Sequence, residues 1–222
     1  MIESIVLDKT TFYQQAYQRV LSVSGLDRPG AKYERMRKVA DSLRAEVEER
    51  AELKIAITGY DDVSIEGETL TIQGETFKCK AFSRLETAHI KRAYVYLLTA
   101  GDFACTERSM VDQVYYDFWG TAFVEEAEHY MDRVLSEESR CSEHFGPGYF
   151  GMPVVAMNQL KNLVDWNSVG VTIRSTGFIE PVKSSGGIIF QVDEAYTPLP
   201  TACGECRGSA ASCRLCMLYK NK

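Results

Sequence analysis

Four cysteines near the end of the chain have the spacing of a metal site. They form two C-x-x-C pairs separated by six residues, at Cys203, Cys206, Cys213 and Cys216. Each pair can chelate through one turn, and four thiolates complete the sulfur environment of zinc or of an iron–sulfur cluster. The separation is shorter than the roughly dozen residues usual in zinc ribbons, which favours a cluster over zinc. Thiol redox chemistry or a disulfide is the remaining alternative.

A second stretch, GPGYFG at 146–151, matches the G-x-G-x-x-G fingerprint of dinucleotide-binding proteins letter for letter. That fingerprint works when a strand leads into the glycines and a helix directly after them presents its amides to a pyrophosphate. Here no strand is expected before the stretch, its proline removes one amide, and the next helix begins only after Pro153. Because Phe145 and Tyr149 flank a backbone that can approach a ligand closely, a pocket for a different, charged small molecule is the better interpretation.

The composition excludes several classes of protein. The 222 residues include 25 basic and 31 acidic side chains, a formal net charge of −6, so the basic surface typical of nucleic-acid binders is not expected. The sequence shows neither a secretory leader nor the roughly 20 apolar residues of a membrane span, and the clustered cysteines suit a reducing compartment. We therefore expect a cytoplasmic protein with neither a nucleic-acid nor a membrane partner.

Hydrophobic periodicity indicates which elements must position these residues. It predicts helices at about 8–24, 32–53, 82–90, 106–135 and 154–166. In the helix at 106–135, the expected buried stripe is Met110, Val114, Phe118 and Ala122. Strand patterns predict a small antiparallel meander over 54–78, a buried strand at 93–101, and three further strands at 170–174, 177–181 and 186–193. This order predicts an α+β fold at 1–194, followed by a Cys-rich tail at 195–222.

Three segments in a fixed order carry a resemblance to a known family. They are HFGPGYFGMP at 144–153, GVTIRSTGFIEPVKSSGGIIF at 170–190 and the cysteines of the tail, with a helix between the first two. In this order and spacing the chain resembles the activation, or reactivation, domain of cobalamin-dependent methionine synthase and its free-standing bacterial relatives. The family patterns run roughly R-F-S-P-G-Y-G-D-x-P and then G-V-x-L-T-E-S-G-x-x-x-P-x-K-S. The resemblance covers about residues 90–216.

The resemblance implies both a fold and a ligand. The fold is an S-adenosylmethionine-binding α+β domain built around a twisted antiparallel sheet with flanking helices. Carried over by position, Pro147, Gly148 and Tyr149 fall on the turn that contacts the ligand. Glu125, in the Val-Glu pair of the long helix, meets the ammonium group of the ligand, and Lys183 of the P-x-K-S segment belongs to the same groove.

Two positions depart from the family pattern. His144 stands where the family has the arginine that pairs with the carboxylate of S-adenosylmethionine. An imidazole lacks the bidentate fork of a guanidinium, and its charge is partial near neutral pH. Arg140, four residues upstream, is therefore a second candidate for the carboxylate. The family sequence T-E-S-G reads RSTG at 174–177, so its glutamate is missing.

The function that the resemblance implies is reductive methylation of a partner's cofactor. An electron reduces cob(II)alamin to cob(I)alamin, which S-adenosylmethionine then methylates to methylcobalamin. The chain contains no D-x-H-x-x-G cobalamin motif, so the cobalamin is expected from a corrinoid protein or methyltransferase, and the electron from a flavodoxin or ferredoxin. The alternatives are a non-catalytic module that docks onto a corrinoid protein, or an iron–sulfur electron-transfer protein that no longer binds S-adenosylmethionine.

Overall fold

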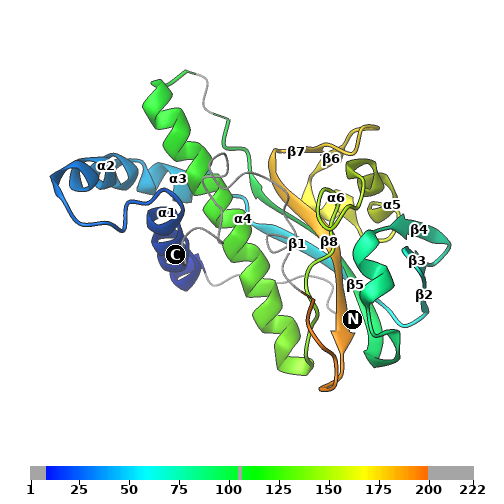
Figure 1. The fold of residues 1–222 in the computed structure, drawn as a ribbon. Helices are drawn as coiled ribbons and strands as arrows, with labels where there is room; N and C mark the ends of the chain where they lie inside the picture. Colours follow the sequence, from blue (N-terminus) through cyan, green and yellow to red (C-terminus); the bar gives the residue numbers. More distant parts are fainter. Residues whose placement is uncertain (1–8, 105–106, 200–222) are drawn as a thin grey trace.

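A three-stranded antiparallel sheet forms the centre of the molecule (Figure 1). The structure is a computed structural model that describes residues 9–104 and 107–199. The sheet has the order β1 (Lys54–Tyr60), β5 (Ile90–Gly101) and β8 (Lys183–Val192). All but the first three residues of β5 are buried, because this central strand is covered on both faces. Tyr94, Tyr96, Leu98 and Ala100 pack into one core, and Ala93, Val95 and Leu97 pack into another.

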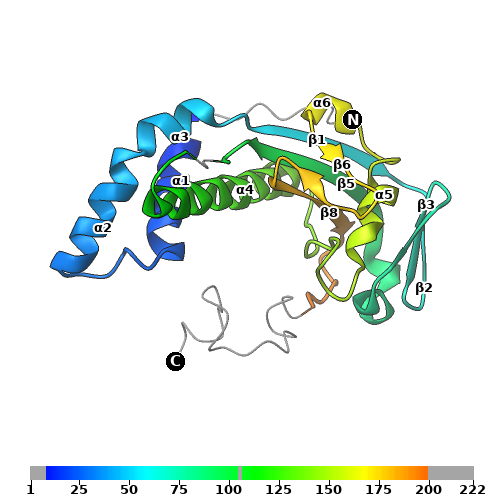
Figure 2. The ribbon, with the colours of Figure 1, turned by 90° about the horizontal axis from the view of Figure 1, so that it is seen from above.

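Four helices lie on one side of this sheet, with α4 next to the strands and α2 projecting away from them (Figure 2). They are α1 (Lys9–Val23), α2 (Ala31–Ser42), α3 (Arg44–Arg50) and the long α4 (Met110–Glu138). The Ser109 side chain accepts a hydrogen bond from the amide of Asp112 at 3.2 Å, which caps the first turn of α4. Because α4 runs across the sheet, its carboxylates lie close to β8 near the middle of the molecule.

The opposite face is covered by small elements. A second sheet, β2 (Val63–Glu66), β3 (Thr69–Ile72) and β4 (Glu75–Lys78), continues into the 3-10 turns η1 (Lys80–Arg84) and η2 (Thr87–His89). After α4 come η3 (Val154–Ala156), α5 (Met157–Leu160) and α6 (Trp166–Val169), and the short hairpin β6 (Thr172–Ile173) and β7 (Ile179–Glu180). Their apolar side chains share the second core with Phe145 and Phe190.

The α+β fold class expected from the sequence is confirmed, with three local corrections. The helix expected at 32–53 is broken at Leu43 into α2 and α3. The one expected at 82–90 is replaced by η1 and η2, and the one expected at 154–166 is shortened to η3 and α5. Strand β1 pairs with β5 and does not join the meander of β2 to β4. The stripe expected on α4 is half right, because Ala122 is buried and Phe118 packs against the core, whereas Met110 and Val114 are 81% and 45% exposed. The buried side of α4 holds Tyr115, Tyr116, Trp119, Ala122, Phe123, Ala127, Met131 and Leu135.

The segment after α4 lies along β8. Isolated antiparallel bridges join Cys141 to Gln191 and Phe145 to Ile188. The two backbone hydrogen bonds between Phe145 and Ile188 measure 2.9 and 2.8 Å. This pairing fixes the start of the glycine stretch against the edge of the central sheet. The division at residue 194 stays a prediction, and the four tail cysteines lie outside the described residues.

Among the residues that the structure describes, no helix combines the length and the apolar character needed to cross a membrane.

Candidate functional site

The glycine stretch forms a tight turn that rests on the sheet. The amide of Tyr149 donates to the carbonyl of Gly146 at 2.9 Å, with proline second and Gly148 (φ 92°) third in the turn, the pattern of a type II turn. A Cβ at Gly146 would lie 2.9 Å from the carbonyl oxygen of Gly186, so only glycine allows this approach. No α-helix follows directly, since the chain next forms the 3-10 turn η3. The structure therefore gives no support to a dinucleotide site.

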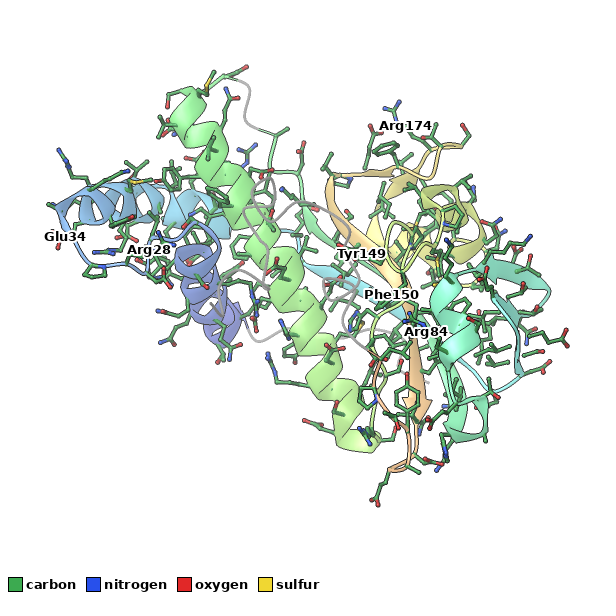
Figure 3. All side chains as sticks on the ribbon, in the orientation of Figure 1. Arg28, Glu34, Arg84, Tyr149, Phe150 and Arg174 are labelled. Carbon is green, nitrogen blue, oxygen red and sulfur yellow. The ribbon has the colours of Figure 1, made fainter. Side chains whose placement is uncertain are left out.

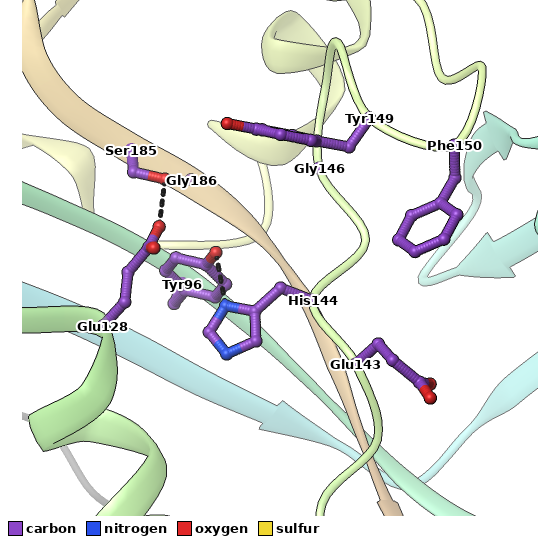
Figure 4. Close-up of a pocket in the computed structure, with 9 residues that line it drawn as sticks. All are labelled: Tyr96, Glu128, Glu143, His144, Gly146, Tyr149, Phe150, Ser185 and Gly186. Carbon is purple, nitrogen blue, oxygen red and sulfur yellow. Dashed lines mark hydrogen bonds between the residues drawn. The ribbon is translucent and has the colours of Figure 1, made fainter. Parts of the chain in front are cut away.

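Two pockets adjoin at the ring of Tyr149. One has a volume of about 360 Å³ and the other about 390 Å³, within the usual range for small-molecule sites. Both are lined by Glu128, Tyr149, Ser185 and Gly186, so we treat them as the inner and outer halves of one groove. Figure 4 shows the inner half, with Glu128 on α4 and Tyr149 on opposite sides of β8. Tyr149 is 60% exposed, which leaves its ring accessible.

His144 stands at the inner half, held between two partners. Its Nε2 donates to Asp132 at 2.6 Å, and its Nδ1 lies 2.9 Å from the hydroxyl of Tyr96. Burial lowers the pKa of His144, but the hydrogen bond to Asp132 and the charges of Asp132 and Glu128 outweigh that effect and raise the pKa above its usual value. The Tyr96 hydroxyl is buried, and burial together with the charge of Glu128 raises its pKa. Both nitrogens of the imidazole are therefore already hydrogen-bonded.

Glu128 is the carboxylate common to both halves of the groove. Its Oε1 accepts a hydrogen bond from the Ser185 hydroxyl at 2.6 Å. Removal from bulk water raises the pKa of Glu128, and the charges of Asp132 and Glu125 act in the same direction. The Ser185 hydrogen bond and the charge of His144 oppose this shift. A carboxylate in such surroundings gains from a cationic partner.

The other residues predicted for the site lie at the outer half. Glu125, with a side chain 35% exposed, lines the groove and accepts from Arg19 of α1 at 3.3 Å. Lys183 lines it too, and its ammonium group donates to Asp117 at 2.6 Å and to Thr121 at 2.9 Å. Pro147 lines the outer half beside the Tyr149 ring, while Gly148 shapes the turn behind it.

Two arginines near the family motifs lie elsewhere. Arg140 donates to the backbone carbonyl of Glu194 at 2.9 Å. Arg174, where the family has its T-E-S-G segment, is paired with Glu180 at 2.6 Å. Figure 3 shows Arg174 at the outer edge of the molecule, apart from Tyr149 and Phe150. Neither side chain lines the groove.

The sequence did not single out Tyr96, Glu128 and Ser185, which line the inner half. Nor did it single out Asp132, which contacts His144. A signal for Glu128 was present, because it follows Glu125 by three residues and therefore shares a face of the helix. Ser185 directly follows the K-S segment. The sequence pattern predicts Tyr96 only as one apolar residue of a buried strand, and nothing in its spacing indicates a contact with His144.

The groove can bind an organic cation, whereas it lacks the groups of a metal site. Three glutamates line it, and aromatic rings from Tyr149, Phe150 and Tyr96 supply apolar contact area. Within the described ranges 9–104 and 107–199, no three histidine, cysteine or carboxylate side chains stand close enough to hold a metal ion.

Comparison with known proteins shows the fold. No protein-family profile matches the sequence, and no curated protein matches it significantly. Among solved structures, the chain is similar to the MetH reactivation domain bound to AdoHcy, with a TM-score of 0.62 and 12% sequence identity. The match covers 90% of this chain and 80% of that one. The chain therefore has the reactivation-domain fold expected from the three sequence segments.

Proposed function

We propose that this protein reactivates a cobalamin-dependent methyltransferase and binds S-adenosylmethionine in the groove between α4 and the turn at Tyr149. One observation carries the proposal. A groove with an accessible aromatic ring and partly buried carboxylates is built from the segments that resemble the family, in a fold similar to a reactivation domain bound to AdoHcy. The same observation favours an S-adenosyl ligand over other organic cations.

The residues of the groove suit the parts of that ligand. The exposed ring of Tyr149 offers a stacking surface for a base, and Glu128 and Glu125 offer carboxylates to an ammonium group. Gly146, which has no side chain, leaves its backbone as part of the wall of the inner half, and Pro147 lines the outer half. S-adenosylmethionine would supply the methyl group, and the chain's own residues orient it.

The cobalamin and the electron would come from other proteins. Exposed apolar side chains surround the outer half of the groove, namely Val154, Val155, Phe178 and Val182. Such a rim suits contact with a corrinoid protein or methyltransferase. We place the protein in the cytoplasm, with a flavodoxin or ferredoxin as electron donor.

The tail cysteines fit the same role. Cys203, Cys206, Cys213 and Cys216 could hold an iron–sulfur cluster, or zinc, in the predicted segment 195–222. A cluster beside the groove would conduct an electron to a docked cobalt, whereas zinc would only order the tail. The domain division at residue 194 belongs to this proposal.

A reactivation assay tests the function. The probe is a cobalamin-dependent methionine synthase that lacks its own reactivation domain and holds cob(II)alamin, with titanium(III) citrate as reductant. Adding the full chain and S-adenosylmethionine is expected to produce the visible spectrum of methylcobalamin, and omitting either is expected to abolish it. If the chain bound S-adenosylmethionine but gave no methylcobalamin, it would be a docking module. If it did not bind the ligand, the electron-transfer alternative would replace the proposal.

A further inference from the structure

The charges that face the groove are mostly negative. Its lining includes Glu125 and Glu128 from α4 and Glu143 from the segment along β8. Among the described lining residues, only His144 and Lys183 can carry a positive charge. A ligand that enters therefore meets an excess of carboxylates, and Coulomb interactions across a few ångströms are strong where water is partly excluded.

The two cations are both engaged. The imidazole of His144 has no free nitrogen, since Asp132 and Tyr96 occupy both, and Asp132 balances its charge. Lys183 is only 15% exposed, and two of its three ammonium hydrogens are directed at Asp117 and Thr121. A carboxylate could bind His144 only by displacing one of these partners, and beside Lys183 it would face Asp117.

The nearest guanidinium on the helical side is also balanced. Arg19 of α1 contacts Glu125 at 3.3 Å and Glu126 at 3.2 Å. The second of these carboxylates is almost fully buried, and Arg133 approaches it as well, at 3.3 Å. Arg19 therefore neutralises carboxylates of α4 and does not offer its charge to the groove.

Two carboxylates at the inner half of the groove differ in how they are satisfied. The Oε1 atom of Glu143 is buried and has no hydrogen-bond partner among the described residues, while its Oε2 accepts from Tyr196 at 2.9 Å. Glu128 accepts from Ser185 through one oxygen. A buried acceptor without a donor is unfavourable by about 1–3 kcal/mol, which applies to Glu143. Glu128 lines both halves of the groove, so its charge favours a ligand that brings a donor.

We infer that the groove recognises the positively charged end of its ligand and does not recognise a carboxylate, so that its ligand class is adenosyl compounds with an ammonium or sulfonium side chain. This inference rests on the proposed function for the adenosyl part. For S-adenosylmethionine it means that the ammonium group faces Glu128, while the carboxylate meets no cationic side chain among the described lining residues that is not already paired. His144 stands at the position of the arginine in the family pattern, and its hydrogen bond to Asp132 keeps the imidazole from taking over a carboxylate contact there.

A set of three ligands tests the inference on the full chain by isothermal titration. S-adenosylmethionine carries both groups, its decarboxylated form keeps only the ammonium, and the deaminated analogue keeps only the carboxylate. The decarboxylated form is expected to bind at least as tightly as S-adenosylmethionine. The deaminated analogue is expected to bind at least about ten-fold more weakly, because it loses a charged hydrogen bond.

The outcomes separate this inference from the function on which it rests. If the decarboxylated form bound about ten-fold more weakly or worse, the carboxylate would be recognised and the inference would be overturned, while the adenosyl site would stand. If none of the three bound, the proposed function itself would fail, and the ligand class with it. His144→Arg supplies a further check, since a guanidinium at this position is expected to shift the preference toward S-adenosylmethionine.

Discussion

Replacing Glu128 by glutamine distinguishes the two carboxylates that can meet a ligand's ammonium group. Glu128→Gln keeps the shape of the side chain and can still accept the hydrogen bond from Ser185, but it removes the charge. Glu128 lines both halves of the groove, whereas Glu125 lines only the outer half. We therefore expect Glu128→Gln to weaken the binding of S-adenosylmethionine more than Glu125→Gln does.

The expected sizes follow from the surroundings of each carboxylate. A hydrogen bond to a charged group that is partly removed from water contributes about 1.5–3 kcal/mol, which corresponds to roughly 10- to 150-fold in Kd. Because glutamine still accepts a hydrogen bond, Glu128→Gln is expected near the lower end, at about ten-fold. Glu125 is 35% exposed and already paired with Arg19. Ion pairs of that kind contribute about 0–1 kcal/mol, so its replacement should change Kd by at most about five-fold.

Isothermal titration of the three proteins with S-adenosylmethionine measures the difference. Glu137→Gln is the matched control. Glu137 is an exposed carboxylate on the same helix that does not line the groove, and its replacement changes the net charge by the same amount. Its Kd is expected to equal that of the unaltered chain. A larger loss of affinity in Glu125→Gln than in Glu128→Gln would refute the placement of the ammonium group at Glu128.

Three further predictions concern the turn, the histidine and the tail. Gly146→Ala would place a Cβ 2.9 Å from the Gly186 carbonyl oxygen. Such overpacking is unfavourable by about 1–3 kcal/mol, which corresponds to a fall in Tm of roughly 2–12 °C. An unchanged Tm in calorimetry would contradict the close approach. The folded-state pKa of His144 is raised, so its stabilisation is complete below the unfolded-state pKa of about 6.5 and is lost as the pH rises through the folded-state pKa. His144→Gln should therefore lower the free energy of unfolding in urea more at about pH 5.5 than at about pH 9, and equal losses would count against the ion pair with Asp132. Anaerobically purified protein should be coloured and should contain iron and acid-labile sulfide. Cys206→Ser should lose the colour, the iron and the sulfide. A colourless protein with one zinc per chain would rule out the cluster.

The sequence predicted the central strands and the long helix because their signals are local. The aromatic and aliphatic density of the run at 93–101 predicts a buried strand, and β5 has that environment. Partners of strands are not local, and for that reason β1 was assigned to the wrong sheet. The stripe on α4 failed at Met110 and Val114, which are apolar yet exposed. Hydrophobic periodicity alone does not show which of two apolar faces of the helix is buried, the one with Met110 and Val114 or the one with Tyr116 and Trp119.

The candidate site was predictable only in part. The turn at Pro147 and Tyr149 and the carboxylate of Glu125 follow from the resemblance, and the structure places all three on the groove. The contacts of His144 with Asp132 and Tyr96 join residues from a loop, a helix and a strand, so they depend on how these elements pack. The same holds for the hydrogen bond between Glu128 and Ser185. Single-sequence patterns contain no information on such pairings.

A crystal structure of the full chain grown with S-adenosylhomocysteine tests the central claim most directly, because it shows both whether an adenosyl ligand binds and where. The account predicts the adenosyl group against the ring of Tyr149 and the ammonium group within hydrogen-bond distance of Glu128. Clear density for the ligand outside this groove, or a groove without ligand at saturating concentrations, would contradict it.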